Sequence, residues 1–139
     1  MHFDSVNKMF QIDKLKTKFQ KALSETKGNA KAQREINALM EDQLKSLREN
    51  KYLRDYDVDR ATKMLELQQK MLELEDARNN RTKLSLRRDS QGNYSYQYSA
   101  DADDVTNKLQ EIRDLKNEIY NLDLNQYRSD LDDYMDLFL

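Results

Sequence analysis

The sequence predicts a mainly α-helical protein of long amphipathic, coiled-coil-like helices, with one β-hairpin inserted near residues 82–99. Three observations lead to this fold class. The chain contains no proline and only two glycines, so few positions force a helix to end. Apolar residues recur at spacings of three and four along most of the chain, which is the pattern of one helix face. Residues 82–99 instead alternate in character with a period of two, as paired strands do.

The N-terminal part predicts two helices joined by a short turn. The first helix occupies residues 1–28 and carries apolar residues at helical spacing from Val6 onward. Gly28 and Asn29 both tolerate positive φ, so they mark the turn. The second helix and its polar connector occupy residues 29–54.

The third helix is predicted for residues 55–81, and Asp55 or Asp57 can cap its first turn. It carries two interleaved apolar series, which make a face wider than a two-stranded coiled-coil seam uses. We therefore expect this helix to contact more than one neighbour, and we predict a homo-oligomer, specifically a trimer. The two series are Ala61, Leu65, Gln68 and Leu72, and Met64, Leu67, Met71 and Leu74.

The hairpin is predicted for residues 82–100. Leu84 and Leu86 share one face of its first strand, and three tyrosines share one face of its second. Gly92 lies in the polar stretch between the strands, where a tight turn needs positive φ. An isolated hairpin is marginal in water, so this apolar face should lie on helices or pair with other copies. The predicted interaction residues are Leu84, Leu86, Gly92, Tyr94, Tyr96 and Tyr98.

The last helix is predicted for residues 101–139, with aspartates in its first turn where they complement the helix dipole. This segment is acidic, whereas the remainder of the chain is mildly basic. Its apolar residues change alignment around 123–125, so we expect a kink, a change of partner or a brief break there. We expect it to pair antiparallel with the third helix. The predicted packing residues are Leu65, Leu72, Ile112 and Ile119.

Composition argues against most chemistry. The chain has no cysteine, one histidine and two glycines, so it lacks the material for a thiol nucleophile, a multi-histidine metal site or a phosphate-binding loop. No stretch approaches the roughly 18 apolar residues of a membrane helix. Aspartate clusters at 101–104 and 130–136 fit helix capping and solvation better than a calcium loop, which needs a turning glycine and a distant carboxylate. We predict no catalytic residue, no cofactor and no metal.

Basic residues beside the tyrosines suggest a nucleic-acid site as an alternative, because single-strand binders combine aromatic stacking with cations. We favour a packing surface: the tyrosines share one face, and lysine and arginine on the other face serve solvation and edge protection. The formal net charge of −2 gives no support for DNA binding. The basic residues concerned are Arg81, Lys83, Arg87 and Arg88.

Three blocks carry a family resemblance: Tyr56–Ala61 (YDVDRA), Leu74–Asn80 (LEDARNN) and Leu86–Tyr98 (LRRDSQGNYSYQY). Together with the flanking residues, about 50–127, they resemble a segment of tape-measure and related internal tail proteins of tailed bacteriophages. The hairpin block is the most specific of the three. The resemblance implies a virion structural protein in the tail, present in several copies and contacting other tail proteins, with assembly in the host cytoplasm. It implies no catalytic residue.

A fully helical chain of this length would span at most about 210 Å, which is short for a tail-length ruler. We therefore expect either a piece of a tape-measure protein or a small virion component that shares the segment. A second function class stays open, that of a coiled-coil adaptor or chaperone that binds a protein partner through its acidic last helix.

Overall fold

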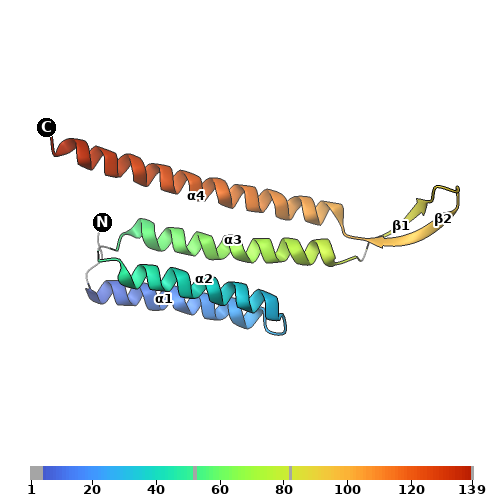
Figure 1. The fold of residues 1–139 in the computed structure, drawn as a ribbon, viewed down its shortest axis with the longest axis horizontal. Coiled ribbons are helices and arrows are strands. Elements are labelled where there is room, and N and C mark those ends of the chain that lie inside the picture. Colours follow the sequence, from blue (N-terminus) through green and yellow to red (C-terminus); the bar gives the residue numbers. More distant parts are fainter. Residues whose placement is uncertain (1–4, 52, 82, 139) are drawn as a thin grey trace. The chain divides into compact units, whose positions relative to one another are not determined.

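The computed structural model describes residues 5–51, 53–81 and 83–138. In this part of the chain, four helices and a two-stranded antiparallel sheet follow one another in the order of Figure 1. The predicted fold class, mainly helical with one inserted β-hairpin, is confirmed. Residues 1–4, 52, 82 and 139, which the predicted elements included, lie outside the described residues. The elements are α1 (Ser5–Glu25), α2 (Ala30–Glu49), α3 (Asp55–Asn79), β1 (Lys83–Arg88), β2 (Tyr94–Ser99) and α4 (Ala102–Asp136).

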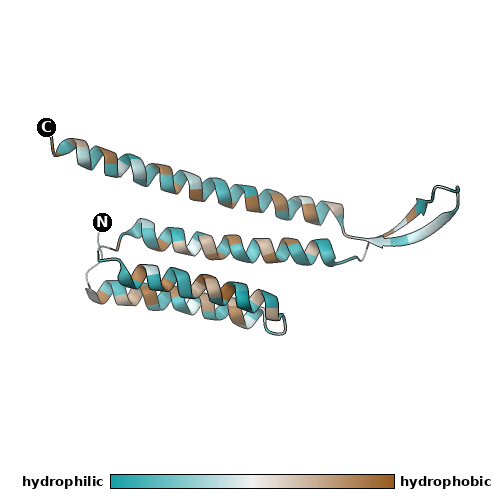
Figure 2. Ribbon diagram, in the orientation of Figure 1, coloured by the Kyte–Doolittle hydropathy of each residue, from teal (hydrophilic) through white to brown (hydrophobic). Residues whose placement is uncertain are grey.

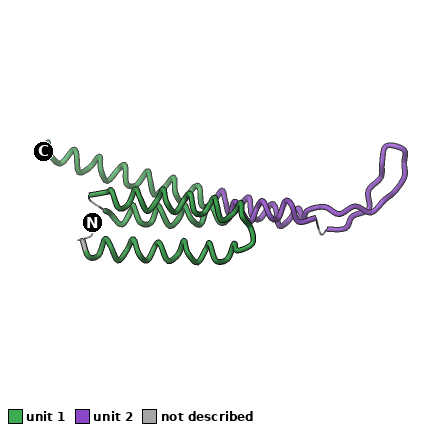
Figure 3. The backbone as a smooth tube through the Cα atoms, turned by 60° about the horizontal axis from the view of Figure 1, so that its bottom comes forward, with its two compact units in different colours: residues 1–69, 115–139 green, residues 70–114 purple. Residues whose placement is uncertain are grey.

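The chain divides into two compact units, coloured separately in Figure 3. The first unit contains the residues up to Gln69 and those from Leu115 onward, and the second contains Lys70–Asp114. Both α3 and α4 therefore contribute to each unit. Among the described residues, none of the helices combines the length and the apolar character that crossing a membrane requires.

In the first unit, α1 and α2 form an antiparallel helix pair around the predicted turn. Gly28 has a φ of +94°, and the side chain of Asn29 accepts a 3.1 Å hydrogen bond from the amide of Ala32. At the other end of the pair, the ammonium group of Lys8 donates to the carbonyl oxygens of Arg48 and Asn50. A cation there complements the negative end of the α2 dipole. The turn at one end and the Lys8 contacts at the other therefore both stabilise the helix pair.

The core of the first unit is built mostly from the apolar stripes that the sequence predicted, but Val6, at the start of the first stripe, is 80% exposed and lies outside it. Phe19, Leu15 and Ile36 are the most deeply buried of the large side chains on α1 and α2. Leu65 of α3 and Ile119 of α4 are buried as well, so all four helices contribute. Burial of this apolar surface is the main term that stabilises the unit.

In the second unit, α3 and α4 pair antiparallel and the hairpin lies between them in sequence. Leu72, Leu74, Ala77 and Ile112 are buried here. A closed ring of ion pairs joins the two helices: Lys70 contacts Glu73 at 3.2 Å and Glu111 at 3.0 Å, and Lys108 contacts Glu73 at 3.2 Å and Glu111 at 3.9 Å. The hydrogen bond from Lys70 is the main reason why the pKa of Glu111 is lowered.

Of the three alternatives expected near residues 123–125, the brief break is not found, since α4 continues from Ala102 to Asp136. No proline or glycine interrupts this segment, and Leu122 and Leu124 are both half-buried within the helix. The change in apolar alignment is therefore a change of helix face. The start of the helix behaves as predicted, because the carboxylate of Asp101 accepts hydrogen bonds from the amides of Asp103 and Asp104 at 3.0 and 3.4 Å.

Part of the wide apolar face of α3 contacts other helices of the same chain. In the first unit, Ala61 and Leu65 are buried, Gln68 donates a 3.0 Å hydrogen bond to Glu35 of α2, and Lys63 contacts Glu118 of α4 at 2.9 Å. Met71 of the second apolar series is 46% exposed, so these in-chain contacts cover the wide face only in part. The trimer itself stays a prediction.

Candidate assembly surfaces

The strand register places the hairpin's apolar residues together. Leu84 pairs with Tyr98, Leu86 with Tyr96, and Arg88 with Tyr94. Residues directly opposite each other in an antiparallel pair share a face, and so do residues two positions apart on one strand. We call these six residues the hairpin face.

Arg88 was predicted on the other side of the hairpin with the remaining basic residues, and this assignment is wrong. Strand alternation puts position 88 on the side of positions 84 and 86, and the guanidinium carbon of Arg88 lies 5.7 Å from the centre of the Tyr94 ring. This distance suits a cation–π contact. Lys83 and Arg87 do lie on the opposite side, with Ser85, Ser95 and Gln97.

The hairpin turn is fixed by Asp89 and Gly92. The carboxylate of Asp89 accepts hydrogen bonds from the amides of Gln91 at 2.9 Å and Asn93 at 2.8 Å. Gly92 has a φ of +85°, and a Cβ there would lie 3.3 Å from the guanidinium of Arg88. The predicted need for glycine at this position is conformational, because a positive φ disfavours other residues; the exposed Arg88 side chain can move away from an added Cβ.

The hairpin face is uncovered in the described structure. Its five apolar side chains are all exposed, and Tyr96 exposes 71% of its surface. The sequence allowed the hairpin to pack on the chain's own helices or on other copies. The chain's own helices do not cover it in the described structure. The exposed side chains are Leu84, Leu86, Tyr94, Tyr96 and Tyr98.

A second uncovered surface runs along the C-terminal half of α4 and ends in the turn that follows Asp136; hydrophobic positions recur along this half of the helix in Figure 2. The rings of Tyr134 and Phe138 contact each other edge to face, with their centroids 5.1 Å apart. We call this set the outer stripe. Its members are Tyr120, Leu124, Tyr127, Leu131, Tyr134 and Phe138; Leu124 is half-buried and the others are exposed.

Beside the outer stripe, a polar cluster joins α3 to α4 within the first unit. The carboxylate of Asp123 accepts hydrogen bonds from the hydroxyl of Tyr56 and from the guanidinium of Arg60, the latter at 2.9 Å. Burial alone would raise the pKa of Asp123, but these donors outweigh it and the pKa is lowered. The pKa of Tyr56 is raised by its burial and by its bond to Asp123.

This cluster was not predicted from the sequence. Tyr56 and Arg60 belong to the YDVDRA block, and Asp123 lies between two leucines on a helix. The available signal was Asp123 itself, a polar residue at the point where the apolar residues of the last helix move from one face to another. That signal identified a special position but not its partners, because Tyr56 and Arg60 are more than sixty residues away in sequence.

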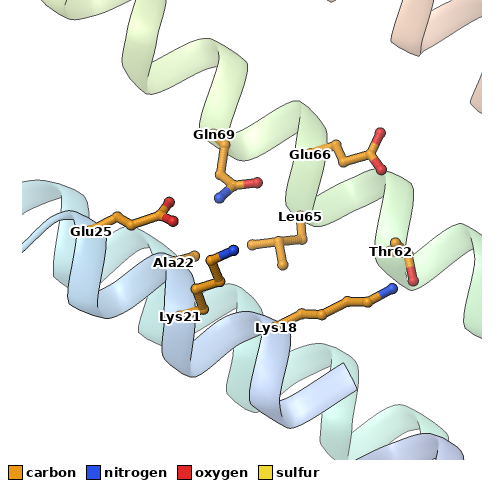
Figure 4. A pocket seen from close by; sticks show the side chains of 8 residues that line it. All are labelled: Lys18, Lys21, Ala22, Glu25, Thr62, Leu65, Glu66 and Gln69. Atoms are coloured by element: carbon orange, nitrogen blue, oxygen red, sulfur yellow. The ribbon is translucent and has the colours of Figure 1, made fainter. Parts of the chain in front are cut away.

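The predicted packing residues are in place, since Leu65, Leu72, Ile112 and Ile119 are all buried. In the first unit, Figure 4 shows a pocket of about 330 Å³ between α1 and α3, with Ala22 and Leu65 in its lining. Lys18 and Lys21 also line it, but Glu25 and Glu66 offset their charge, so the pocket has no net electrostatic preference. Among the described residues, no group of histidine, cysteine or carboxylate side chains is arranged to hold a metal ion.

The fold and these surfaces define a helical protein with a β-hairpin and with uncovered apolar faces, among them the hairpin face and the outer stripe. No family model, curated protein or solved structure shows significant similarity to the chain.

Asp123 offers a direct test of the α3–α4 connection. Replacing Asp123 by asparagine is expected to lower the free energy of unfolding by about 1 kcal/mol, because charge-assisted hydrogen bonds are lost at a partly exposed site. The lowered pKa means that the charge stabilises the protein above the ordinary aspartate pKa of about 3.9 and stops doing so as pH falls through the folded-state value. Urea unfolding at pH 7 and under acidic conditions checks both expectations.

The matched control is Asp132→Asn, an exposed aspartate on the same helix. It should change stability by less than about 0.5 kcal/mol. Equal effects of the two substitutions, or an unchanged pH profile for Asp123→Asn, would contradict the role assigned to this cluster.

Proposed function

We propose that this chain is a structural component of a bacteriophage tail that acts by self-assembly rather than by catalysis. The observation that carries the proposal is the uncovered hairpin face. A two-stranded hairpin with an exposed apolar face is marginal in water without a covering surface. A second copy of the chain would supply that surface, alone or together with another tail protein.

The resemblance to internal tail proteins supports the same function. Its most specific block, Leu86–Tyr98, forms most of the hairpin, including its turn and all three tyrosines. The segment that links the chain to tape-measure-like proteins is thus the element that requires an external contact. In this proposal, helices α3 and α4 carry the hairpin, and the hairpin makes the lateral contact in the assembly.

An electron-microscopy reconstruction of purified tails that contain this protein tests the proposal. We expect density for the helices inside the particle, with Tyr94, Tyr96 and Tyr98 covered by another copy or by a neighbouring tail protein. Absence of the protein from purified tails would contradict the proposal. So would a hairpin face that is open to solvent inside the particle.

A coiled-coil adaptor or chaperone is the second candidate, and the exposed outer stripe of α4 favours it. Such a protein would use this stripe to bind a different protein and would not need its own copies. The two candidates differ in one measurable respect, since only the structural protein must self-associate when purified alone.

A further inference from the structure

Helix α4 carries apolar residues on two separate sides. Ile112, Leu115 and Ile119 are buried. At 100° per residue, the outer stripe is centred roughly 100° around the helix from them. One neighbour cannot cover both sides, so the outer stripe needs a partner of its own.

The spacing of the outer stripe is that of a coiled-coil seam. Its members follow one another at intervals of four, three, four, three and four residues, from Tyr120 to Phe138. An interval that alternates in this way is the a/d pattern of a heptad repeat. The tyrosines of such a seam place their rings in the contact and their hydroxyls at its wet edge.

The polar residues around the stripe leave the seam free. Asp132, Asp133 and Asp136 project from the sides of the helix away from the stripe, where a coiled coil faces water. Asp130 lies on the flank toward α3 and contacts Arg54 at 3.3 Å. Arg128 lies on the opposite flank and is exposed.

We propose that the outer stripe is a coiled-coil seam for the same stripe of a second copy, with the two α4 helices parallel and in register. The inference rests on the self-association in the proposed function and adds a second contact surface to the hairpin face. The seam is self-complementary, because every a or d residue of one helix meets the identical residue of the other.

Charge selects the parallel orientation. A fully overlapped antiparallel pair would place Arg128 beside Arg128 of the second copy, and Asp130 beside its Asp130. The parallel pair instead brings Asp123 of one chain toward Arg128 of the other, at the positions where coiled coils form interhelical ion pairs. An ionised carboxylate offers about four acceptor sites, so Asp123 can bind Arg128 of the second copy in addition to Tyr56 and Arg60.

Because the chain contains no cysteine, a single engineered cysteine reports the contact cleanly. In the full chain carrying Tyr120→Cys, the parallel pair brings the two thiols together. Mild oxidation at micromolar concentration should then link most of the protein as a disulfide dimer. The control is Ser129→Cys, an exposed position on the far side of α4, for which we expect at least tenfold less dimer.

Adding Leu131→Asp to Tyr120→Cys should lower the dimer yield at least tenfold, because the substitution puts a charge into the seam. Leu131 is exposed, so the variant should keep the circular dichroism of the parent. Equal cross-linking of Tyr120→Cys and Ser129→Cys would overturn the inference. Cross-linking of a Tyr120→Cys chain to a Phe138→Cys chain, without Tyr120→Cys homodimers, would overturn the parallel orientation.

Failure of this inference is distinguishable from failure of the proposed function. If Tyr120→Cys does not cross-link but the wild-type chain still self-associates, the outer stripe is not the contact and the proposed assembly function stands. If the wild-type chain stays monomeric as well, both are wrong.

Discussion

Replacing Tyr94, Tyr96 and Tyr98 together by serine is expected to weaken self-association by about a thousandfold. The three tyrosines are half of the six residues of the hairpin face, and all three are exposed in the described structure. Aromatic residues commonly dominate the energy of protein interfaces, and the loss of three would cost about 4 kcal/mol. Sedimentation velocity over a range of concentrations measures the effect. The helical circular dichroism should remain, because the tyrosines take no part in the buried core.

The control is a double substitution on the other side of the hairpin, Ser95→Ala with Gln97→Ala. It changes the same strand but leaves the hairpin face intact, so association should stay within about threefold of the wild type, as expected for surface changes outside an interface. An unchanged oligomer in the tyrosine variant would contradict the assembly role of the hairpin. If that variant lost only the binding of a different protein, the adaptor function would be favoured instead.

The nucleic-acid alternative has a different signature. Binding through the hairpin would weaken steeply with salt, because phosphate contacts release counterions. It would also be lost on replacing Arg87 and Arg88, whereas the packing surface depends mainly on the tyrosines.

Replacing Phe19 by alanine is expected to lower the free energy of unfolding by about 3–5 kcal/mol, as large-to-small substitutions in a core do. Phe19 is 0% exposed and contributes to the core of the first unit. The change removes buried apolar surface and leaves a cavity that neighbouring side chains fill only in part. Urea denaturation followed by circular dichroism measures the loss.

Phe10 provides a matched control on the same helix. It is 61% exposed, so Phe10→Ala should cost less than about 1 kcal/mol. If both substitutions had the same effect, α1 would not pack with the face that the structure shows. A larger effect of Phe10→Ala on association than on unfolding would indicate that this exposed ring also belongs to an assembly contact.

The sequence could predict the helices and the hairpin because their signals are local. The 4–3 spacing of apolar residues, the turn at Gly28 and the alternation around Gly92 each involve only a few neighbouring residues. The burial of Leu65, Leu72, Ile112 and Ile119 follows from the same spacing. Residues 123–125 were the exception, because the sequence did not decide between a break and a continuous helix. Two apolar stripes that are offset from each other are expected both for a broken helix and for an unbroken helix with two apolar faces.

The contacts between distant segments could not be predicted in the same way. The bonds of Asp123 to Tyr56 and Arg60 depend on how α3 and α4 align, and no local pattern encodes this alignment. The place of Arg88 on the hairpin face could have been predicted, because strand parity fixes it once the strand limits are known. Tyr120 could not be grouped with the outer stripe from the sequence, since its spacing to Leu124 is meaningful only in an unbroken helix.

The central claim is that this chain associates with itself through uncovered apolar faces. Analytical ultracentrifugation of the purified wild-type chain tests it most directly. We expect the mass at micromolar concentration to rise to at least twice that of one chain and to fall on dilution. A compact and stable monomer throughout the micromolar range would contradict it.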